Sequence, residues 1–328
     1  MDAARPGAAV PTAAPASDAV AALIALDWGT TALRAYLLDA AGVVLERRES
    51  REGIRNVPAR DFAGTFDRAV AGWDARLPAI ACGMIGSRNG WHEVPYVDAP
   101  AGVQALAGAL ARVPGARLWI VPGVRVVGAH GDPDVMRGEE TQLVGAAAAA
   151  GDGLYVHPGT HAKWARVRGG RIESFATWMT GELHAALLGH TILGAFDSSA
   201  GDARGFDAAA FDAGVSRAHA AADFTHALFT ARSRVLEAGM PAAQVRDFLS
   251  GLLIGEELRG ARAAGWLDGR ARAILIGRDA LVARYARAFD ACGVPHEVGP
   301  DEPVVVGLVA VARAARLASP HGLEGRQP

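Results

Sequence analysis

The chain has 328 residues, of which 51% are hydrophobic and 21% charged, and its formal net charge is −2. This composition excludes a disordered chain, and the near-neutral charge gives no reason to expect a nucleic-acid or membrane-surface partner. The length favours two domains, with one large α/β domain as the alternative. The two cysteines, Cys82 and Cys292, lie far apart without metal-ligand spacing, which is typical of reduced thiols in a cytoplasmic protein.

Both ends of the chain are expected to lie outside the folded part. Residues 1–20 are rich in Ala and Pro and lack a basic start followed by an apolar run, so we expect a disordered extension rather than a signal peptide. A second tail is expected over residues 319–328. No apolar stretch is long enough to span a bilayer without Gly, Pro or a charge, so a soluble protein is expected.

Strands and helices are predicted to alternate in the first half of the chain. Continuous apolar runs predict strands, and apolar residues at helical spacing predict helices. The predicted strands are 23–28, 34–38, 43–48, 79–84 and 118–121; the predicted helices are 60–75 and 138–150, with a polar and aromatic loop at 85–100 and a loop rich in Gly, Asp and Pro before the second helix.

The second half begins with the same pattern and ends mostly in helices. The predicted strands are 154–157, 163–167, 171–178 and 273–277; the predicted helices start near 182 and continue at 206–238, 242–263, 279–291 and 303–317. Each half therefore starts with a strand, a Gly-Thr turn, a strand, a second turn and a strand.

An internal duplication is indicated when the two halves are superposed at an offset of 130 residues, which places Gly29 on Gly159 and Thr30 on Thr160. Ala32 also falls on Ala162 and Ala35 on Ala165. The shared order of elements carries more weight than these small residues. We predict two related domains, 21–150 and 151–318.

The two Gly-Thr turns are candidates for holding phosphate groups. Glycine allows a close backbone approach, threonine adds a hydroxyl donor, and turn N–H groups can face an anion. Asp27, at the end of the first strand, suits a magnesium ion held through water. Each turn alone would equally fit an ordinary hairpin, and the pairing favours phosphate binding. The chain contains no GxxxxGK[ST] motif and no GxGxxG after a strand, which argues against a P-loop enzyme and a dinucleotide fold.

Several longer motifs resemble the 2-dehydro-3-deoxygalactonokinase family, which belongs to the superfamily of sugar kinases, actin and heat-shock ATPases. They are DWGTTALRAY (27–36), GSRNGWHEVPY (86–96), VMRGEETQLVGA (135–146), PGTHAKW (158–164), TWMTGELH (177–184) and DFLSGLLIGEEL (247–258). The resemblance implies an α/β fold of two duplicated ribonuclease-H-like (actin-like ATPase) domains with an ATP cleft between them. It also implies Mg²⁺-dependent transfer of the ATP γ-phosphate to the 6-hydroxyl of 2-dehydro-3-deoxy-D-galactonate, in galactonate catabolism.

The resemblance also assigns residues to the nucleotide. The first phosphate motif contains Asp27, which is also the expected metal ligand, with Gly29, Thr30 and Thr31; the second contains Gly159, Thr160 and His161. His157 stands at the position offset from Asp27, which puts a second metal ligand in doubt. Gly277 and Arg278 resemble the superfamily's adenosine motif, and an ordinary helix start is the alternative.

Two catalytic roles follow. The superfamily's base is a carboxylate at the start of the helix before the second domain, where Glu140 aligns best and Glu139 is the alternative. Acidic residues in a first helical turn also stabilise the helix dipole without any catalytic role. Lys163 is the only lysine among 33 basic residues, so we expect a compact ammonium at the ATP phosphates or the transferring phosphoryl group, with chance survival on a strand as the alternative.

The small-molecule sugar acid needs a cation for its carboxylate, and a guanidinium can bind a carboxylate through two hydrogen bonds. The candidates are Arg88 and Arg137, although any single arginine can instead be a solvated surface charge. Further candidates around the substrate are Trp91, Thr180, Glu182 and His184, for which core packing or helix capping are the alternatives.

Two other functions remain open from the sequence: a kinase of another keto-deoxy sugar acid, such as 2-dehydro-3-deoxygluconate, and a non-metabolic ATPase of the actin-like fold. The first differs at one stereocentre, which a few polar groups would distinguish. The second usually carries extra subdomains, for which this chain has little spare length. The sequence does not predict the oligomeric state.

Overall fold

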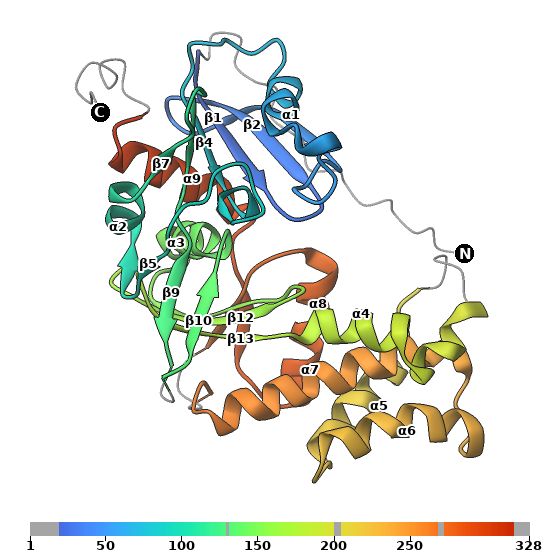
Figure 1. The fold of residues 1–328 in the computed structure, drawn as a ribbon. Coiled ribbons are helices and arrows are strands. Elements are labelled where there is room, and N and C mark those ends of the chain that lie inside the picture. The colour runs from blue at the N-terminus through green and yellow to red at the C-terminus, as the bar shows by residue number, and fades with distance from the viewer. Residues whose placement is uncertain (1–19, 129–130, 200–204, 268–271, 318–328) are drawn as a thin grey trace, which may run out of the picture.

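The computed structural model describes residues 20–128, 131–199, 205–267 and 272–317 (Figure 1). The predicted tails, 1–20 and 319–328, lie outside this range apart from Val20. Within the described part, the helices are too short or too polar to cross a bilayer.

The first sheet has the strand order β3-β2-β1-β4-β8-β7. The first three strands are antiparallel neighbours, while β4 and β8 run parallel to β1, and β7 closes the edge antiparallel to β8. Leu23 to Leu26 of β1 are all buried, as expected of a central strand covered on both faces. The strands are β1 (Ala21–Trp28), β2 (Leu33–Asp39), β3 (Val44–Ser50), β4 (Ala79–Cys82), β7 (Ala111–Arg112) and β8 (Leu118–Ile120).

The second sheet has the order β15-β14-β11-β12-β13-β6. Its strands are β11 (Gly153–His157), β12 (Ala162–Arg168), β13 (Arg171–Trp178), β14 (Ala273–Leu275), β15 (His296–Val298) and β6 (Ala101–Gly102), the last contributed by the first half of the chain. Three antiparallel strands followed by two parallel ones recur here, with β11, β12, β13, β14 and β15 in the places of β1, β2, β3, β4 and β8. The duplication seen in the sequence is therefore present in the topology.

Helices α3 (Glu139–Ala150) and α9 (Pro303–Ala314) pack against each other, and one hydrophobic core joins them to side chains of both sheets (Figure 1). The two helices touch backbone to backbone: a Cβ on Gly145 would lie 1.9 Å from the Pro303 carbonyl oxygen, and one on Gly307 would lie 2.0 Å from that of Thr141. The predicted boundary at residue 150 coincides with the end of α3. The two predicted domains stay a prediction, because α9 packs back on β1 and β4 while β6 joins the second sheet.

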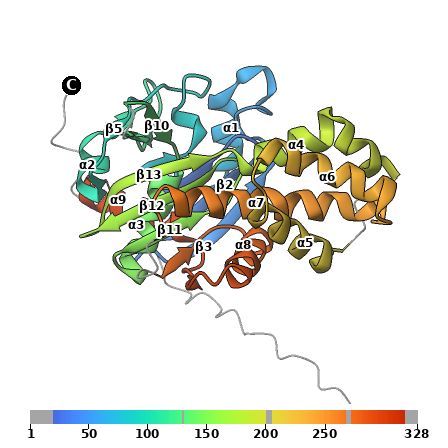
Figure 2. The same ribbon diagram turned by 90° about the horizontal axis from the view of Figure 1, so that it is seen from below.

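A layer of helices extends from the second sheet (Figures 1 and 2). It contains α4 (Thr180–His190), η3 (Ile192–Ser199), α5 (Ala208–His219), α6 (Phe224–Glu237), η4 (Ala242–Gln244), α7 (Val245–Ala263) and α8 (Asp279–Ala291). The helical segment predicted over 206–238 consists of two helices, α5 and α6. The chain turns between α5 and α6, and the Asp223 carboxylate caps α6 by accepting a hydrogen bond from the His226 N–H at 2.8 Å.

The remaining elements belong to the first half: α1 (Phe62–Ala69), α2 (Val103–Gly108), the short 3₁₀ turns η1 (Pro58–Arg60) and η2 (Met84–Gly86), and β5 (Val97–Asp98). The loop predicted before α3 contains two strands, β9 (Val124–Val127) and β10 (Pro133–Met136), which form a three-stranded sheet with β5. That part of the prediction is wrong because both strands are short and mix polar with apolar residues.

Candidate active site

A cleft of about 1050 Å³ is lined by residues from both halves of the molecule. It is bordered by the β1–β2 turn, the β11–β12 turn, the start of α3, the β14–α8 step and the segment before α9. Its volume is at the upper end of the range usual for ligand sites. Both predicted phosphate motifs therefore face one cleft.

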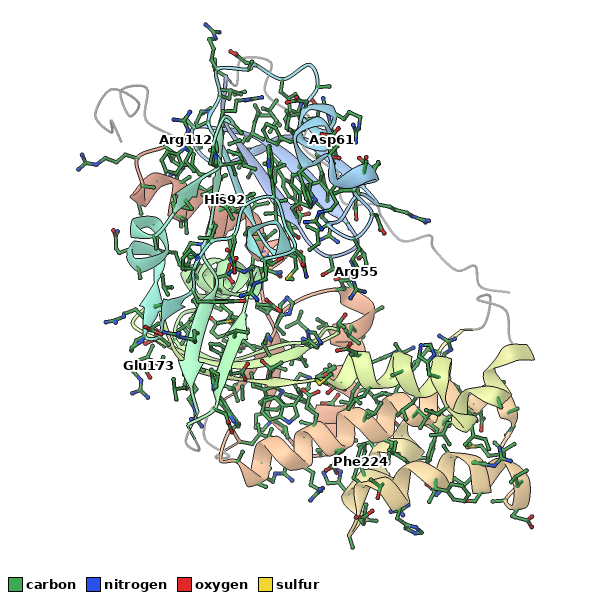
Figure 3. All side chains as sticks on the ribbon, in the orientation of Figure 1. Arg55, Asp61, His92, Arg112, Glu173 and Phe224 are labelled. Carbon is green, nitrogen blue, oxygen red and sulfur yellow. The ribbon has the colours of Figure 1, made fainter. Side chains whose placement is uncertain are left out.

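The β1–β2 turn brings Asp27, Gly29, Thr30 and Thr31 to the cleft. The Gly29 N–H donates to the Ala32 carbonyl at 3.0 Å, which closes the turn. A Cβ on Gly29 would meet only that same carbonyl, at 3.7 Å, so the turn presents bare backbone to open space. Arg55, labelled in Figure 3, follows β3 and supports the turn by donating its backbone N–H to the Thr30 carbonyl at 3.1 Å.

Asp27 is held by an arginine that the sequence analysis did not single out. Arg34 Nη1 lies 3.0 Å from Asp27 Oδ2, and both residues line the cleft. Burial raises the pKa of Asp27, and Arg34 opposes that rise through its charge and hydrogen bond. One carboxylate oxygen of Asp27 is thus fixed by Arg34.

The β11–β12 turn brings His157, Gly159, Thr160 and His161 to the same cleft. Burial lowers the pKa of His157, which favours the neutral imidazole, and His157 Nε2 lies 2.9 Å from Gln142 Oε1 on α3. His161 Nε2 lies 2.6 Å from Glu182 Oε2, so two predicted site residues pair directly.

The start of α3 separates the two candidate bases. Glu139 lines the cleft, and its Oε2 accepts a hydrogen bond from the Arg137 backbone N–H at 3.1 Å. Glu140 is fully buried and turned into the helix start, where it accepts from the Gly138 N–H at 2.6 Å and the Thr141 hydroxyl at 2.8 Å. Burial, followed by the charge of Glu139, raises the pKa of Glu140 to about 7. The placement therefore favours Glu139 over the residue that aligned best.

Lys163 is 4% exposed and is not among the residues lining the cleft in the described part of the chain. Its ammonium donates to the Val135 carbonyl at 3.1 Å and to the Thr177 hydroxyl at 2.8 Å. The Thr177 hydroxyl in turn donates to Asp134 Oδ1 at 2.6 Å. These contacts join β12 and β13 to β10 and do not support the predicted role at a phosphoryl group.

The two candidate arginines occupy different surroundings. Arg137 lines the cleft but is only 7% exposed; its Nη2 donates to the Val94 carbonyl at 2.6 Å, and its guanidinium lies 4.4 Å from the Tyr96 ring centroid. Its Nε and Nη1 are buried without a hydrogen-bond partner. Arg88 is highly exposed, with its Nε 3.6 Å from Glu93 Oε1, and does not line the cleft.

The other predicted substrate residues are turned elsewhere. Trp91 packs against Trp28 and Phe66 in the first-half core. His184 Nε2 lies 3.0 Å from the Arg246 carbonyl, beside a small cavity of about 70 Å³ next to the cleft. Thr180 is buried, and its hydroxyl donates to Glu257. Glu182 does not line the cleft itself but pairs with His161, which does.

Gly277 and Arg278 do line the cleft, at the step from β14 into α8, where Gly277 has a φ of 134° that favours glycine. The sequence analysis missed several other lining residues: Arg34, Arg47, Gln142, Asp301 and Glu302. Gln142 follows Glu139 by three residues on one helical face, a spacing that could have indicated it. Glu302 lies in an irregular segment before α9 and pairs with Arg47, and no local pattern indicates either.

Residues 27–311 match the family described as 2-keto-3-deoxy-galactonokinase. The chain belongs to this family. That confirms the resemblance predicted from the motifs, and by family the protein is a carbohydrate kinase.

Individual relatives agree with the family match. The "Probable 2-dehydro-3-deoxygalactonokinase DgoK1" of Rhizobium meliloti (strain 1021) is 41% identical over 302 residues, covering 88% of this chain and 96% of that one. The 2-dehydro-3-deoxygalactonokinase of Escherichia coli (strain K12) is 37% identical over 297 residues, covering 89% and 97%.

Solved structures confirm the predicted fold class. A crystal structure from Sinorhizobium meliloti, whose protein bears the same family name, has a TM-score of 0.81 at 39% identity and covers 89% of this chain and 98% of its own. The activator of a 2-hydroxyisocaproyl-CoA dehydratase from Clostridium difficile, solved with bound ADPNP, has a TM-score of 0.51 at 14% identity, covering 93% and 98%. The second likeness concerns the fold alone.

The residues of the cleft fit a nucleotide with a magnesium ion. Two glycine turns present backbone to the cleft from opposite halves, a geometry suited to a chain of phosphates. In the described residues, no group of three or more His, Cys, Asp or Glu could hold a metal by itself. Mg²⁺ commonly needs only one or two carboxylates, because phosphates and water complete its shell, and Asp27 is placed to supply one.

Proposed function

We propose that the protein transfers the γ-phosphoryl group of ATP to the 6-hydroxyl of 2-dehydro-3-deoxy-D-galactonate, with Mg²⁺, in galactonate catabolism. The observation that carries the proposal is that a chain of this kinase family gathers both Gly-Thr turns and the carboxylate of Glu139 around one cleft. The two free cysteines, one of them buried, fit a cytoplasmic location.

The two turns hold the phosphates from opposite sides in this proposal. Backbone N–H groups and hydroxyls at Thr30 and Thr31, beside the bare backbone of Gly29, face the chain of phosphates from one half, and Gly159, Thr160 and His161 face it from the other. Asp27 holds the magnesium ion, which supplies charge neutralisation at the phosphates. Gly277 and Arg278 lie beside the nucleoside.

Glu139 acts as the base in this proposal. It is the carboxylate of the acidic pair that lines the cleft, and the Arg137 N–H fixes one of its oxygens. Its free oxygen accepts the proton of the 6-hydroxyl as that oxygen attacks phosphorus. Glu140 holds the Gly138 N–H and so keeps the turn before α3 in place.

Arg137 binds the carboxylate of the sugar acid in this proposal. A buried guanidinium with unpaired N–H groups is costly unless an anion meets it, and only its Nη2 has a partner, the Val94 carbonyl, with the Tyr96 ring centroid 4.4 Å away. Arg137→Gln should therefore raise KM for the sugar acid roughly ten- to a hundred-fold and leave KM for ATP nearly unchanged. Arg88→Gln tests the alternative arginine. A larger rise in KM for the sugar acid in that variant would show that the substrate carboxylate binds at the exposed loop.

A coupled assay of ADP release across keto-deoxy sugar acids, hexonates and plain aldoses tests the proposed function. We expect turnover only with Mg²⁺ and a 2-keto-3-deoxy sugar acid, with the galacto form preferred. Preference for the gluco form would change the substrate, and equal ADP release without any acceptor would instead favour a non-metabolic ATPase.

A further inference from the structure

Glu257, on α7, is a carboxylate with 2% exposure whose contacts are all neutral donors. Its Oε1 accepts from Trp164 Nε1 at 2.6 Å, and its Oε2 accepts from the Tyr285 hydroxyl at 2.7 Å and from the Thr180 hydroxyl. Burial raises the pKa of Glu257, and the three hydrogen bonds oppose that rise. Burying a carboxylate costs free energy unless its oxygens accept hydrogen bonds. The three donors offset that cost only while they keep hydrogen-bonding distance to Glu257.

The three donors come from three elements on the second-half side of the cleft. Trp164 is on β12, the strand that leaves the second Gly-Thr turn; Thr180 is the first residue of α4; Tyr285 is on α8, which follows the step at Gly277. Glu257 is thus the common acceptor of the strand that follows the second turn and of two helices that border the cleft.

The two residues that follow Thr180 on α4 contact the second Gly-Thr turn. Gly181 packs so closely on that turn that a Cβ would lie 2.4 Å from the Gly159 carbonyl oxygen. The next residue, Glu182, donates its N–H to the Thr160 carbonyl at 2.9 Å. Any shift of the start of α4 would therefore move the Gly159–Thr160 backbone as well.

The Tyr285 contact reaches the neighbouring space. Tyr285 and Thr180 both line the cavity of about 70 Å³, which shares Gly159, Gly181 and Leu281 with the main cleft. One carboxylate therefore sits behind both the turn and the small cavity, on the opposite half from Glu139 and Arg137.

We propose that Glu257 is a positioning residue for the nucleotide: it fixes the second Gly-Thr turn and the adjoining α4–α8 wall without touching the ligand. The inference rests on the proposed function, which puts phosphates at that turn. It requires Glu257 to act on nucleotide affinity and to leave the sugar-acid side unaffected.

The test measures binding of a non-hydrolysable ATP analogue by calorimetry, and KM for the sugar acid, in wild type and in Glu257→Gln. Glutamine keeps the size but puts an NH₂ group opposite at least one donor. We expect Kd for the analogue to rise about ten-fold or more, and KM for the sugar acid to stay within about two-fold. Tyr285→Phe, which removes one donor and keeps the ring, should give a smaller rise and serves if Glu257→Gln does not fold.

Asp223→Ala is the matched control, since it removes the cap of α6 in the same helical layer but makes no contact with the cleft lining in the described residues. It should lower Tm and leave both constants unchanged. Unchanged analogue affinity in Glu257→Gln and Tyr285→Phe would overturn the inference. It would also be overturned if Kd for the analogue and KM for the sugar acid both rose in proportion to the fall in Tm. Wild-type protein that binds no analogue would overturn the proposed function itself.

Discussion

The two Gly-Thr turns both bring glycine backbone to the cleft, but they differ by one residue in strand register and in the side chains around them. In the first turn, the strand ends in Asp27, which pairs with Arg34 at 3.0 Å. In the second, the strand ends in His157, whose imidazole faces Gln142 at 2.9 Å. Lys163 is the cross-strand partner of His157, in the place that Arg34 holds beside Asp27.

This difference shows what each half of a duplicated fold retains. Both turns keep a glycine whose bare backbone faces the cleft, and turn backbone of this kind can face an anion whatever the side chains around it. In the proposed function a carboxylate for the metal is needed once, and the second half has His157 at that position. At His157 the side chain instead connects the second turn to α3, the helix between the sheets.

The sharpest test of this comparison replaces Asp27 and His157 by asparagine in two separate variants. Asp27→Asn removes the carboxylate charge and should lower kcat by about 10³-fold, because a metal and its phosphates lose their only charged protein ligand in the proposal. His157→Asn should lower kcat by less than about ten-fold. Steady-state kinetics over a range of Mg²⁺ concentrations measures both.

The Mg²⁺ titration provides the control for that pair. Asp27→Asn should need more Mg²⁺ for half-maximal rate, while His157→Asn should not. Equal losses in the two variants would show that both halves carry the charge chemistry, and the comparison would fail.

The next largest effect is expected at the start of α3. Glu139→Gln keeps the size and one acceptor but cannot take a proton, so kcat should fall about 10²-fold with little change in ATP affinity. Glu140→Gln should lower kcat less, because Glu140 faces the helix start and not the cleft. A larger rate loss in Glu140→Gln than in Glu139→Gln, measured in a single-turnover assay, would show that Glu140, which the sequence alignment favoured, is the base.

The choice between Glu139 and Glu140 also shows where sequence reasoning stops. The motif places an acidic pair at a helix start, but neighbouring residues on a helix point about 100° apart, so a one-residue ambiguity decides which carboxylate meets the substrate. The duplication, by contrast, could be read from Gly29 and Gly159, because a turn between strands has a local signature.

Contacts between distant elements could not be read in this way. Thr180 looked like a cleft residue from its neighbours, yet its hydroxyl meets Glu257 across 77 residues of chain. The return of α9 to the first sheet has no local signal either, since its apolar residues would suit any core. The strands β9 and β10 were missed because each has only four residues, and β10 starts with a proline and an aspartate.

A smaller effect is expected in the pH dependence of stability. The pKa of Glu140 is raised from 4.5 to about 7, so the folded state holds a proton that the unfolded state has lost between those values. The free energy of unfolding should therefore fall as pH rises from about 4.5 to 7, by up to about 3 kcal/mol from this group. Glu140→Gln should remove that fall, which chemical denaturation at pH 5, 6, 7 and 8 would detect. Parallel pH profiles for the variant and wild type would contradict the burial argument.

The smallest effect on catalysis is expected at Lys163. In the strand register Lys163 pairs with His157 as Arg34 pairs with Asp27, so its counterpart in the first half is Arg34. In the second copy the ammonium is used by the Val135 carbonyl and the Thr177 hydroxyl. The sequence alone predicted a large loss of kcat in both Lys163→Arg and Lys163→Met, on the ground that a compact cation contacts the phosphoryl group.

The structure predicts a different pair of outcomes for these variants. Both should keep kcat and KM for ATP within about three-fold of wild type, because the ammonium does not line the cleft. Lys163→Met leaves two part-buried acceptors, the Val135 carbonyl and the Thr177 hydroxyl, without this donor and should lower the free energy of unfolding by about 1 kcal/mol. Lys163→Arg must fit a larger planar group into the same buried space and should also lower it. Loss of about 10²-fold in kcat with an unchanged Tm would instead show that the ammonium reaches the nucleotide during turnover.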